Sequence, residues 1–100
     1  MASEKLMNAE MTARCAEILK AMGHPVRLKI IELLCAGDNC VSELEAKLGV
    51  KQAIVSQQIK ILRLSGLVRP ERRDGRSFYC LAMPYLVGLM ACLRQCGCRE

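Results

Sequence analysis

The feature that most limits the fold is a pair of short extended runs near the end of an otherwise helical pattern. The runs span about residues 67–72 and 76–81 and are joined through Arg73-Asp74-Gly75. An Asp-Gly pair between two such runs is typical of a β-hairpin. Pro70 places the first run at a sheet edge, which a two-stranded ribbon permits. The chain is therefore expected to be mainly α-helical, with one small β-hairpin.

Apolar residues in the remaining segments recur at spacings of three and four, which is the period of an α-helix. The expected helices span about residues 7–22, 25–35, 42–48, 52–65 and 83–95. Ser42 is expected to cap the third helix, because Glu45 three residues later completes a capping-box pattern. A chain of 100 residues is too short for two separate cores, so residues 1–100 are expected to form a single domain.

The fourth expected helix has two different faces. Val55, Ile59 and Leu62 share one face and form a core stripe. The other face carries short polar and basic side chains without an acid, namely Gln52, Ser56, Gln57, Lys60 and Arg63. Gln and Ser can hydrogen-bond to base edges in a major groove, and Lys and Arg can contact phosphates.

The charge of the chain is concentrated on the same helix and on the hairpin. Residues 51–76 carry seven basic and two acidic side chains, which accounts for the whole formal charge of +5. A charge run alone is more often a solvated surface, but this one includes Arg72, Arg73 and Arg76 around the hairpin tip. The pattern predicts a winged helix-turn-helix, with the helix-turn-helix at about 42–65 and the wing at about 67–81. Winged helices also act as protein-interaction modules, but the charge favours a double-stranded DNA partner.

Several motifs match a known family in order and spacing over about residues 15–90. They include LKAMGHPVRL at 19–28, VSEL at 41–44, VSQQ at 55–58, SGLV at 65–68 and DGR at 74–76. On these motifs the chain resembles the ArsR/SmtB family of bacterial winged-helix repressors. The resemblance implies a homodimer held by helices at about 5–22 and 83–96. It also implies binding to operator DNA in the ligand-free or reduced state, and release when an inducer reacts. Lys51 departs from the Ser or Thr cap that the family often has.

The resemblance also directs attention to the cysteines, of which there are seven. An odd number without a secretory signal favours reduced thiols over a disulfide framework. A family site for arsenite, cadmium or lead has two thiols near the third helix. Here Cys40 keeps the first and Ser42 replaces the second. A family zinc site needs Asp and His on the last helix, which has neither, so that kind of sensor is not expected.

The last helix carries further thiols. Cys92 and Cys96 share a face, and Cys98 follows the expected helix end. This arrangement, with one thiol before the third helix and one at the end of the last helix, resembles that of a family subgroup that senses persulfides. In that subgroup a sulfur bridge forms between the two thiols. By that resemblance the sensor pair is Cys40 with Cys98, or with Cys96 as second choice, and Arg94 and Arg99 flank the C-terminal thiols.

Two alternatives to that pair remain open. No cofactor is required, but arsenite or another soft metal ion could bind Cys92, Cys96 and Cys98, or two of them with Cys40. In the second alternative these cysteines only fill apolar positions, as is expected for Cys15, Cys35 and Cys80.

Other functional classes are less favoured. A small thiol enzyme or metal carrier would need a Cys-x-x-Cys motif or a base beside a thiol, and the single histidine, His24, fits a helix entry. The protein is therefore not expected to be an enzyme. The longest uncharged run, residues 77–93, is shorter than a membrane span and is interrupted by Pro84 and Gly88. A cytoplasmic protein with no membrane partner is expected.

Overall fold

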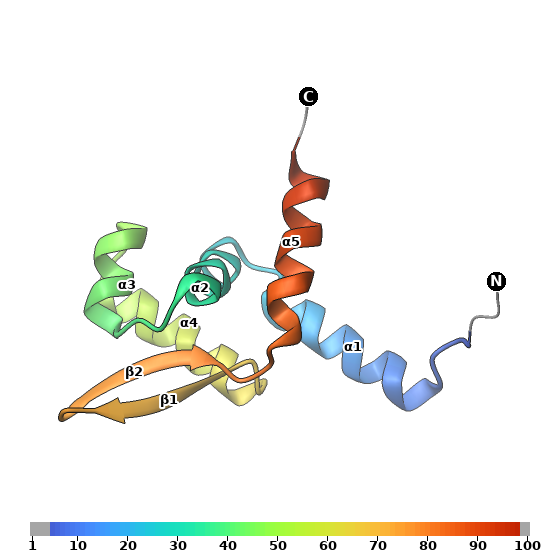
Figure 1. Ribbon diagram of the computed structural model, residues 1–100, viewed down its shortest axis with the longest axis horizontal. Coiled ribbons are helices and arrows are strands. Elements are labelled where there is room, and N and C mark those ends of the chain that lie inside the picture. Colours follow the sequence, from blue (N-terminus) through green and yellow to red (C-terminus); the bar gives the residue numbers. More distant parts are fainter. Residues whose placement is uncertain (1–4, 99–100) are drawn as a thin grey trace.

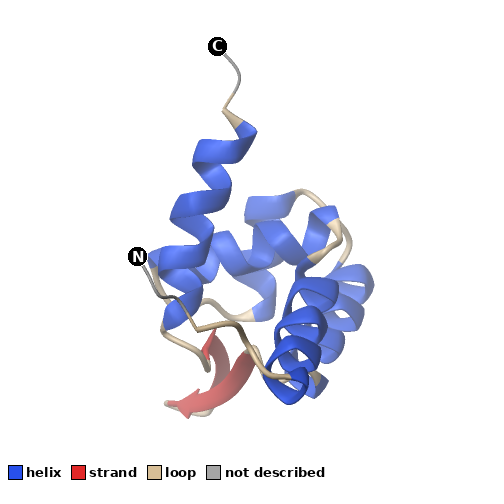
Figure 2. Cartoon of the chain, turned by 90° about the vertical axis from the view of Figure 1, so that its right-hand side faces the viewer, coloured by secondary structure: helices blue, strands red, loops and turns tan. Residues whose placement is uncertain are grey.

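The computed structural model describes residues 5–98, which form five helices and one antiparallel hairpin in the expected order (Figure 1). The elements are α1 (Ala9–Met22), α2 (Pro25–Ala36), α3 (Val41–Leu48), α4 (Gln52–Leu64), β1 (Val68–Arg73), β2 (Arg76–Leu81) and α5 (Tyr85–Gly97). Figure 2 shows the hairpin at one end of the helices and the last turns of α5 extending from the other. The winged helix-turn-helix architecture is confirmed.

The starts of the first two helices follow from local hydrogen bonding. Asn8 caps α1, because its Oδ1 accepts the backbone N–H of Met11 at 2.8 Å, so α1 begins two residues later than the apolar pattern indicates. His24 caps α2 with its Nδ1, which accepts from the backbone N–H of Val26 at 3.1 Å. The interpretation of His24 as a helix-entry residue is confirmed.

The expected start of the third helix was wrong. Cys40, not Ser42, is the N-cap residue of α3, and the carboxylate of Glu43, not Glu45, accepts the backbone N–H of Cys40 at 2.9 Å. The reason lies in the preceding residue. Asn39 pairs with β2 and keeps the chain extended through Cys40, so that the helix starts directly after it.

The hairpin turns on Asp74 and Gly75, both of which have a positive φ, of 50° and 76°. Pro70 lies opposite Tyr79, whose backbone N–H and C=O both bond to Asn39 instead of β1, at 2.8 and 3.2 Å. Because these groups point away from β1, the missing N–H of Pro70 removes no bond from the hairpin. The strand containing Pro70 lies at an edge, as expected.

The core lies between α2, α3, α4 and the base of the hairpin. Its most buried side chains come from all of these elements, and both terminal helices add to them: Met22, Ile30, Ile31, Leu34, Leu44, Val55, Ile59, Leu62, Leu67, Val68, Leu86 and Met90. The expected core stripe of α4 is therefore buried. The last helix begins at Tyr85, after Pro84, rather than near Met83. Within residues 5–98, no helix is both long and apolar enough to cross a membrane.

Candidate nucleic-acid interface and thiol site

The polar face of α4 is fully available to a ligand. The five side chains of this helix that are expected to contact DNA are all exposed, namely Gln52, Ser56, Gln57, Lys60 and Arg63. Within the described chain, no ion pair involves Lys60 or Arg63. Because burial of the core stripe fixes the rotation of α4, these side chains can contact an approaching duplex without a rearrangement of the helix.

The three wing arginines lie in different surroundings. Arg72 is exposed and donates to the carbonyl oxygen of Gly75 at 3.1 Å. Arg73 and Arg76 lie opposite each other on the two strands, and both guanidinium groups stack on Phe78, with carbon-to-centroid distances of 5.3 and 5.1 Å. These cation–π contacts hold two positive charges together on the wing.

Arg73 is also ion-paired within the molecule. Its Nη2 donates to the carboxylate of Asp38, in the α2–α3 connector, and to Glu71 Oε1 at 2.8 Å. Hydrogen bonds to Asp38 and Glu71 raise the pKa of Arg73, and the hydrogen bond from Arg73 lowers the pKa of Glu71. To contact a phosphate, Arg73 would exchange these internal partners for an external one.

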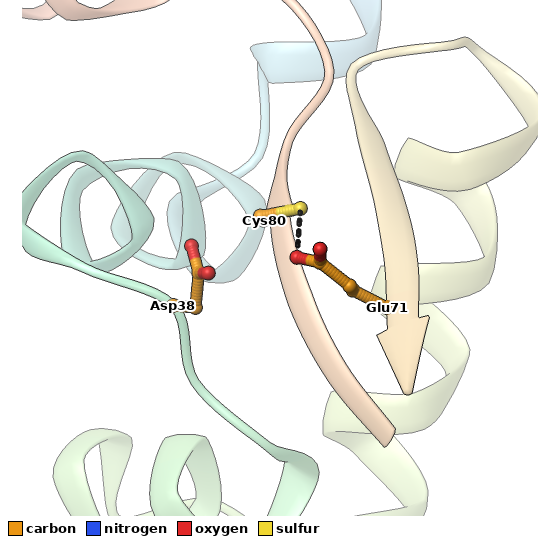
Figure 3. Close-up of side chains that lie close together, drawn as sticks. All are labelled: Asp38, Glu71 and Cys80. Atoms are coloured by element: carbon orange, nitrogen blue, oxygen red, sulfur yellow. Dashed lines mark hydrogen bonds between the residues drawn. The ribbon is translucent and has the colours of Figure 1, made fainter. Parts of the chain in front are cut away.

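Asp38 and Glu71 lie close to Cys80 (Figure 3). From the sequence, Cys80 was expected only to fill an apolar position. One ligand atom from each residue lies within 4.8 Å of the others. Cys80 is buried, and desolvation raises the pKa of its thiol. Two carboxylates and a sulfur could hold a divalent ion, but the guanidinium of Arg73 already bonds to both carboxylates. Arg73 therefore joins Asp38 of the connector to Glu71 of the wing.

Cys40 lies where the start of α3 meets the wing. Its side chain is 5% exposed, its Sγ is 3.2 Å from Ser42 Oγ, and Arg76 Nη2 donates to Sγ at 3.0 Å. The hydrogen bond from Ser42 lowers the pKa of the Cys40 thiol, and the backbone N–H of Glu43 adds to this effect. The surroundings therefore favour the thiolate, which is the nucleophilic form of cysteine.

The C-terminal thiols lie elsewhere in the molecule. Cys92 and Cys96 are exposed on α5, and Cys98 is the C-cap residue of the same helix. Figure 1 shows the last turns of α5 extending away from α3, so the start of α3, which holds Cys40, and the end of α5, which holds Cys98, lie apart in one protomer. Over residues 5–98, the three C-terminal thiols also do not form a compact ligand group. Arg94 pairs with Glu32 at 3.5 Å, and Arg99 lies outside the described residues.

An apolar groove lies between α1 and α5. It has a volume of about 220 Å³ and is lined by Cys15, Ile18, Leu19 and Leu89. Further large apolar side chains are exposed on the same two helices, namely Met11, Tyr85 and Val87. An exposed apolar surface that spans two terminal helices is typical of a protein–protein contact.

Comparison with known proteins identifies the family. A model for bacterial regulatory proteins of the arsR family matches residues 24–69. The biofilm growth-associated repressor of Xylella fastidiosa is 36% identical over 85 residues, which are 85% of this chain and 75% of that protein. The chain belongs to the ArsR family. This ArsR-family protein is a transcriptional repressor and not an enzyme.

Solved structures agree with this assignment. HlyU from Vibrio cholerae matches the ArsR-family chain with a TM-score of 0.83 and 28% identity, covering 92% of this chain and 100% of HlyU. Mb0332 from Mycobacterium bovis is described as a homodimeric winged helix-turn-helix DNA-binding domain. It matches with a TM-score of 0.79 and 26% identity, covering 96% of this chain and 89% of that one.

Proposed function

We propose that this ArsR-family repressor is a homodimer that binds operator DNA through α4 and the wing, and that thiol chemistry at Cys40 relieves this binding. The observation that carries the DNA-binding part is the exposed face of α4, where no acid accompanies Gln52, Ser56, Gln57, Lys60 and Arg63. The helix would enter the major groove, and Arg72, Arg73 and Arg76 would lie along the neighbouring backbone or minor groove.

The dimer part of the proposal rests on the apolar surface of α1 and α5. The groove formed by Cys15, Ile18, Leu19 and Leu89 faces solvent in the single chain. A second copy of the same surface would bury these side chains through a two-fold contact, because such a contact is self-complementary. Mb0332 is described as homodimeric, which supports a dimer for this chain but does not bear on which surface forms it.

The sensing part rests on the surroundings of Cys40, whose thiolate is favoured by Ser42 and the start of α3. With a persulfide inducer, the Cys40 thiolate attacks the outer sulfur, forms Cys40–S–SH and releases the remaining thiolate. The thiolate of Cys98, or of Cys96, then attacks the Cys40 sulfur and expels hydrosulfide. Two thiols are oxidised by two electrons, and the sulfane sulfur is reduced to sulfide.

The position of α5 constrains where this bridge forms. Because the C-terminal end of α5 extends away from α3 of the same protomer, the second thiol reaches Cys40 either from the partner protomer or after α5 moves. Electrophoresis without reductant separates the two routes. A bridge between protomers gives a covalent dimer, whereas a bridge within one protomer leaves the mass of the denatured chain unchanged.

The test begins with reduced protein and a randomised duplex library, from which an operator is selected. Operator affinity is then measured by fluorescence anisotropy after parallel treatment with glutathione persulfide and with arsenite, and the products are mapped by peptide mass spectrometry. We expect the persulfide to weaken operator binding and to link Cys40 to Cys98 or Cys96.

Matched variants complete this test. Cys40→Ser should bind the operator in the reduced state and no longer respond, whereas Cys92→Ser should respond like the parent. A Cys40→Ser protein that still responds would remove Cys40 from the sensing step. An arsenic adduct on three thiols, with no persulfide link, would make the protein a metalloid sensor instead.

A further inference from the structure

The connector between α2 and α3 is attached to the wing at three successive residues. Asp38 pairs with Arg73, the backbone of Asn39 bonds to Tyr79 in both directions, and Cys40 Sγ accepts from Arg76. Asn39 is 2% exposed, and its side chain is held by the carbonyl of Gly37 and by Lys47. Cys40 is therefore held beside β2 by the backbone as well as by its own side chain.

The contacts continue from Cys40 to the tip of the wing. Arg76 bonds to the Cys40 sulfur and stacks on the ring of Phe78. Arg73 stacks on the same ring and forms an ion pair with Asp38 in the connector. Two arginines proposed to contact DNA thus share one ring, and one of them also bonds to the proposed sensor thiol. A change at the sulfur alters the partner of Arg76 directly.

The space around the sulfur determines what such a change does. A sulfur atom added to Cys40 would bond at about 2.05 Å, but Arg76 Nη2 and Ser42 Oγ already lie 3.0 and 3.2 Å from Sγ. Because Cys40 is 5% exposed, the added atom needs space that these neighbours fill. A Cys40 sulfur in a disulfide also cannot ionise, so it cannot form the charge-assisted hydrogen bond that a thiolate forms with a guanidinium.

We propose that Arg76 is the positioning residue that transmits the chemical state of Cys40 to the wing. In the reduced protein, the sulfur holds Arg76 and with it the start of β2. A substituent on the sulfur displaces the guanidinium, and the wing loses one of its three attachments to the connector. This inference rests on the proposed role of Cys40 as sensor thiol. It adds that a small substituent on Cys40 is sufficient, without a bridge to α5.

The experiment uses a parent variant in which the exposed Cys92, Cys96 and Cys98 are replaced by Ser. Methyl methanethiosulfonate supplies the substituent: the Cys40 thiolate attacks its sulfenyl sulfur, Cys40–S–S–CH3 forms, and methanesulfinate leaves. Peptide mass spectrometry confirms the labelled position. The same treatment of a Cys40→Ser version of the parent corrects for labelling of the remaining thiols.

The first readout is hydrogen exchange over residues 68–81. Labelling Cys40 should accelerate exchange in β2 about tenfold, the size of one hydrogen bond to a charged group. In Arg76→Gln, β2 should exchange faster than in the parent before labelling, and labelling of Cys40 should change this exchange rate little. Arg72→Gln is the matched control, because the contact of Arg72 is with Gly75 at the tip, and it should respond like the parent.

The second readout is operator affinity, which separates this inference from the proposed function. Faster exchange in β2 with unchanged operator affinity would support the role of Arg76 and overturn Cys40 as sensor. Weaker operator binding with unchanged hydrogen exchange in β2 would support Cys40 as sensor and overturn the role of Arg76. The inference is also overturned if labelling accelerates hydrogen exchange in β2 of Arg76→Gln as much as in β2 of the parent.

Discussion

At the scale of single residues, Cys40 differs from the other buried thiol of the chain. Cys40 and Cys80 are both buried and lie on the two sides of the connector–wing contact. Burial raises the pKa of Cys80, whereas the hydrogen bond from Ser42 lowers the pKa of Cys40. Two thiols of similar exposure are therefore expected to have different reactivity, because only the thiolate is nucleophilic.

The first prediction concerns the pH dependence of this reactivity. The rate of Cys40 alkylation should rise with pH through a midpoint below that of an ordinary thiol, because the thiolate is stabilised in the folded protein. Ser42→Ala should shift the midpoint upward, since it removes the largest cause of the lowered pKa. Peptide-resolved labelling between pH 6 and 10, roughly the range in which thiols titrate, measures both. A midpoint that Ser42→Ala leaves unchanged would contradict this explanation.

A second prediction concerns base recognition by α4. Gln57→Ala should reduce the preference for the selected operator over random duplex by about 1–3 kcal/mol, because Gln57 lies on the exposed polar face. Competition binding at constant salt measures the preference. Gln95→Ala, an exposed change on α5, is the control and should leave it unaltered. Equal losses on both duplexes would assign Gln57 to the backbone rather than to a base.

At the scale of elements, the wing is a charged ribbon whose arginines are divided between internal and external partners. Arg73 is ion-paired with Asp38 and Glu71, whereas Arg72 bonds only to its own turn among the contacts of residues 5–98. These are exposed pairs, which contribute little to folding stability. DNA phosphates can therefore replace the carboxylates at small cost.

The third prediction follows from this division of partners. Arg73→Ala should weaken binding to all duplexes alike and reduce the slope of log affinity against log salt by about 1. Asp38→Asn removes an internal partner of Arg73 and should strengthen binding to random duplex at low salt. Titrations at several salt concentrations test both variants. An unchanged slope in Arg73→Ala would place this side chain away from the phosphates.

The elements themselves were largely predictable from the sequence, because periodicity and turn residues are local signals. The two faces of α4 follow from its spacing, and the Asp74–Gly75 turn follows from residue type. The start of α3 was placed wrongly, because two overlapping capping patterns exist and the choice depends on Asn39 pairing with Tyr79. That pairing joins positions far apart in the chain, and local patterns carry no information about it.

The candidate site was predictable to a smaller extent. Cys40 and the wing arginines were each identified, but neither the contact between Cys40 and Arg76 nor the pairing of Arg73 with Asp38 was expected. The acidic residues Asp38 and Glu71 were the available signal, because an acid near a cluster of arginines can pair with one of them.

At the scale of the whole molecule, α1 and α5 extend from the compact centre and expose apolar surface (Figure 1). The core takes Ala21 and Met22 from the end of α1 and Leu86 and Met90 from the first half of α5, and the remaining lengths of both helices extend beyond it. The two terminal helices are thus available to set the distance between two DNA-binding units. The distance between half-sites on DNA follows from that geometry.

The fourth prediction tests the dimer. Leu19→Glu places a charge in the α1–α5 groove and should shift the protein toward monomer and weaken operator binding, with the helical content retained because Leu19 is 54% exposed. Sedimentation velocity and circular dichroism measure the two properties. Ala46→Glu, on the exposed side of α3, should remain dimeric. A dimeric Leu19→Glu protein would place the interface elsewhere.

The pairing of Pro70 with Tyr79 has a consequence for how the protein behaves at high concentration. A two-stranded ribbon normally offers two open edges to which strands from other molecules can add. Here Asn39 occupies one edge at Tyr79, and on the other Pro70 removes the N–H that would point outward, between Arg69 and Glu71. The wing can therefore project from the molecule to meet a duplex without acting as a template for intermolecular sheet growth.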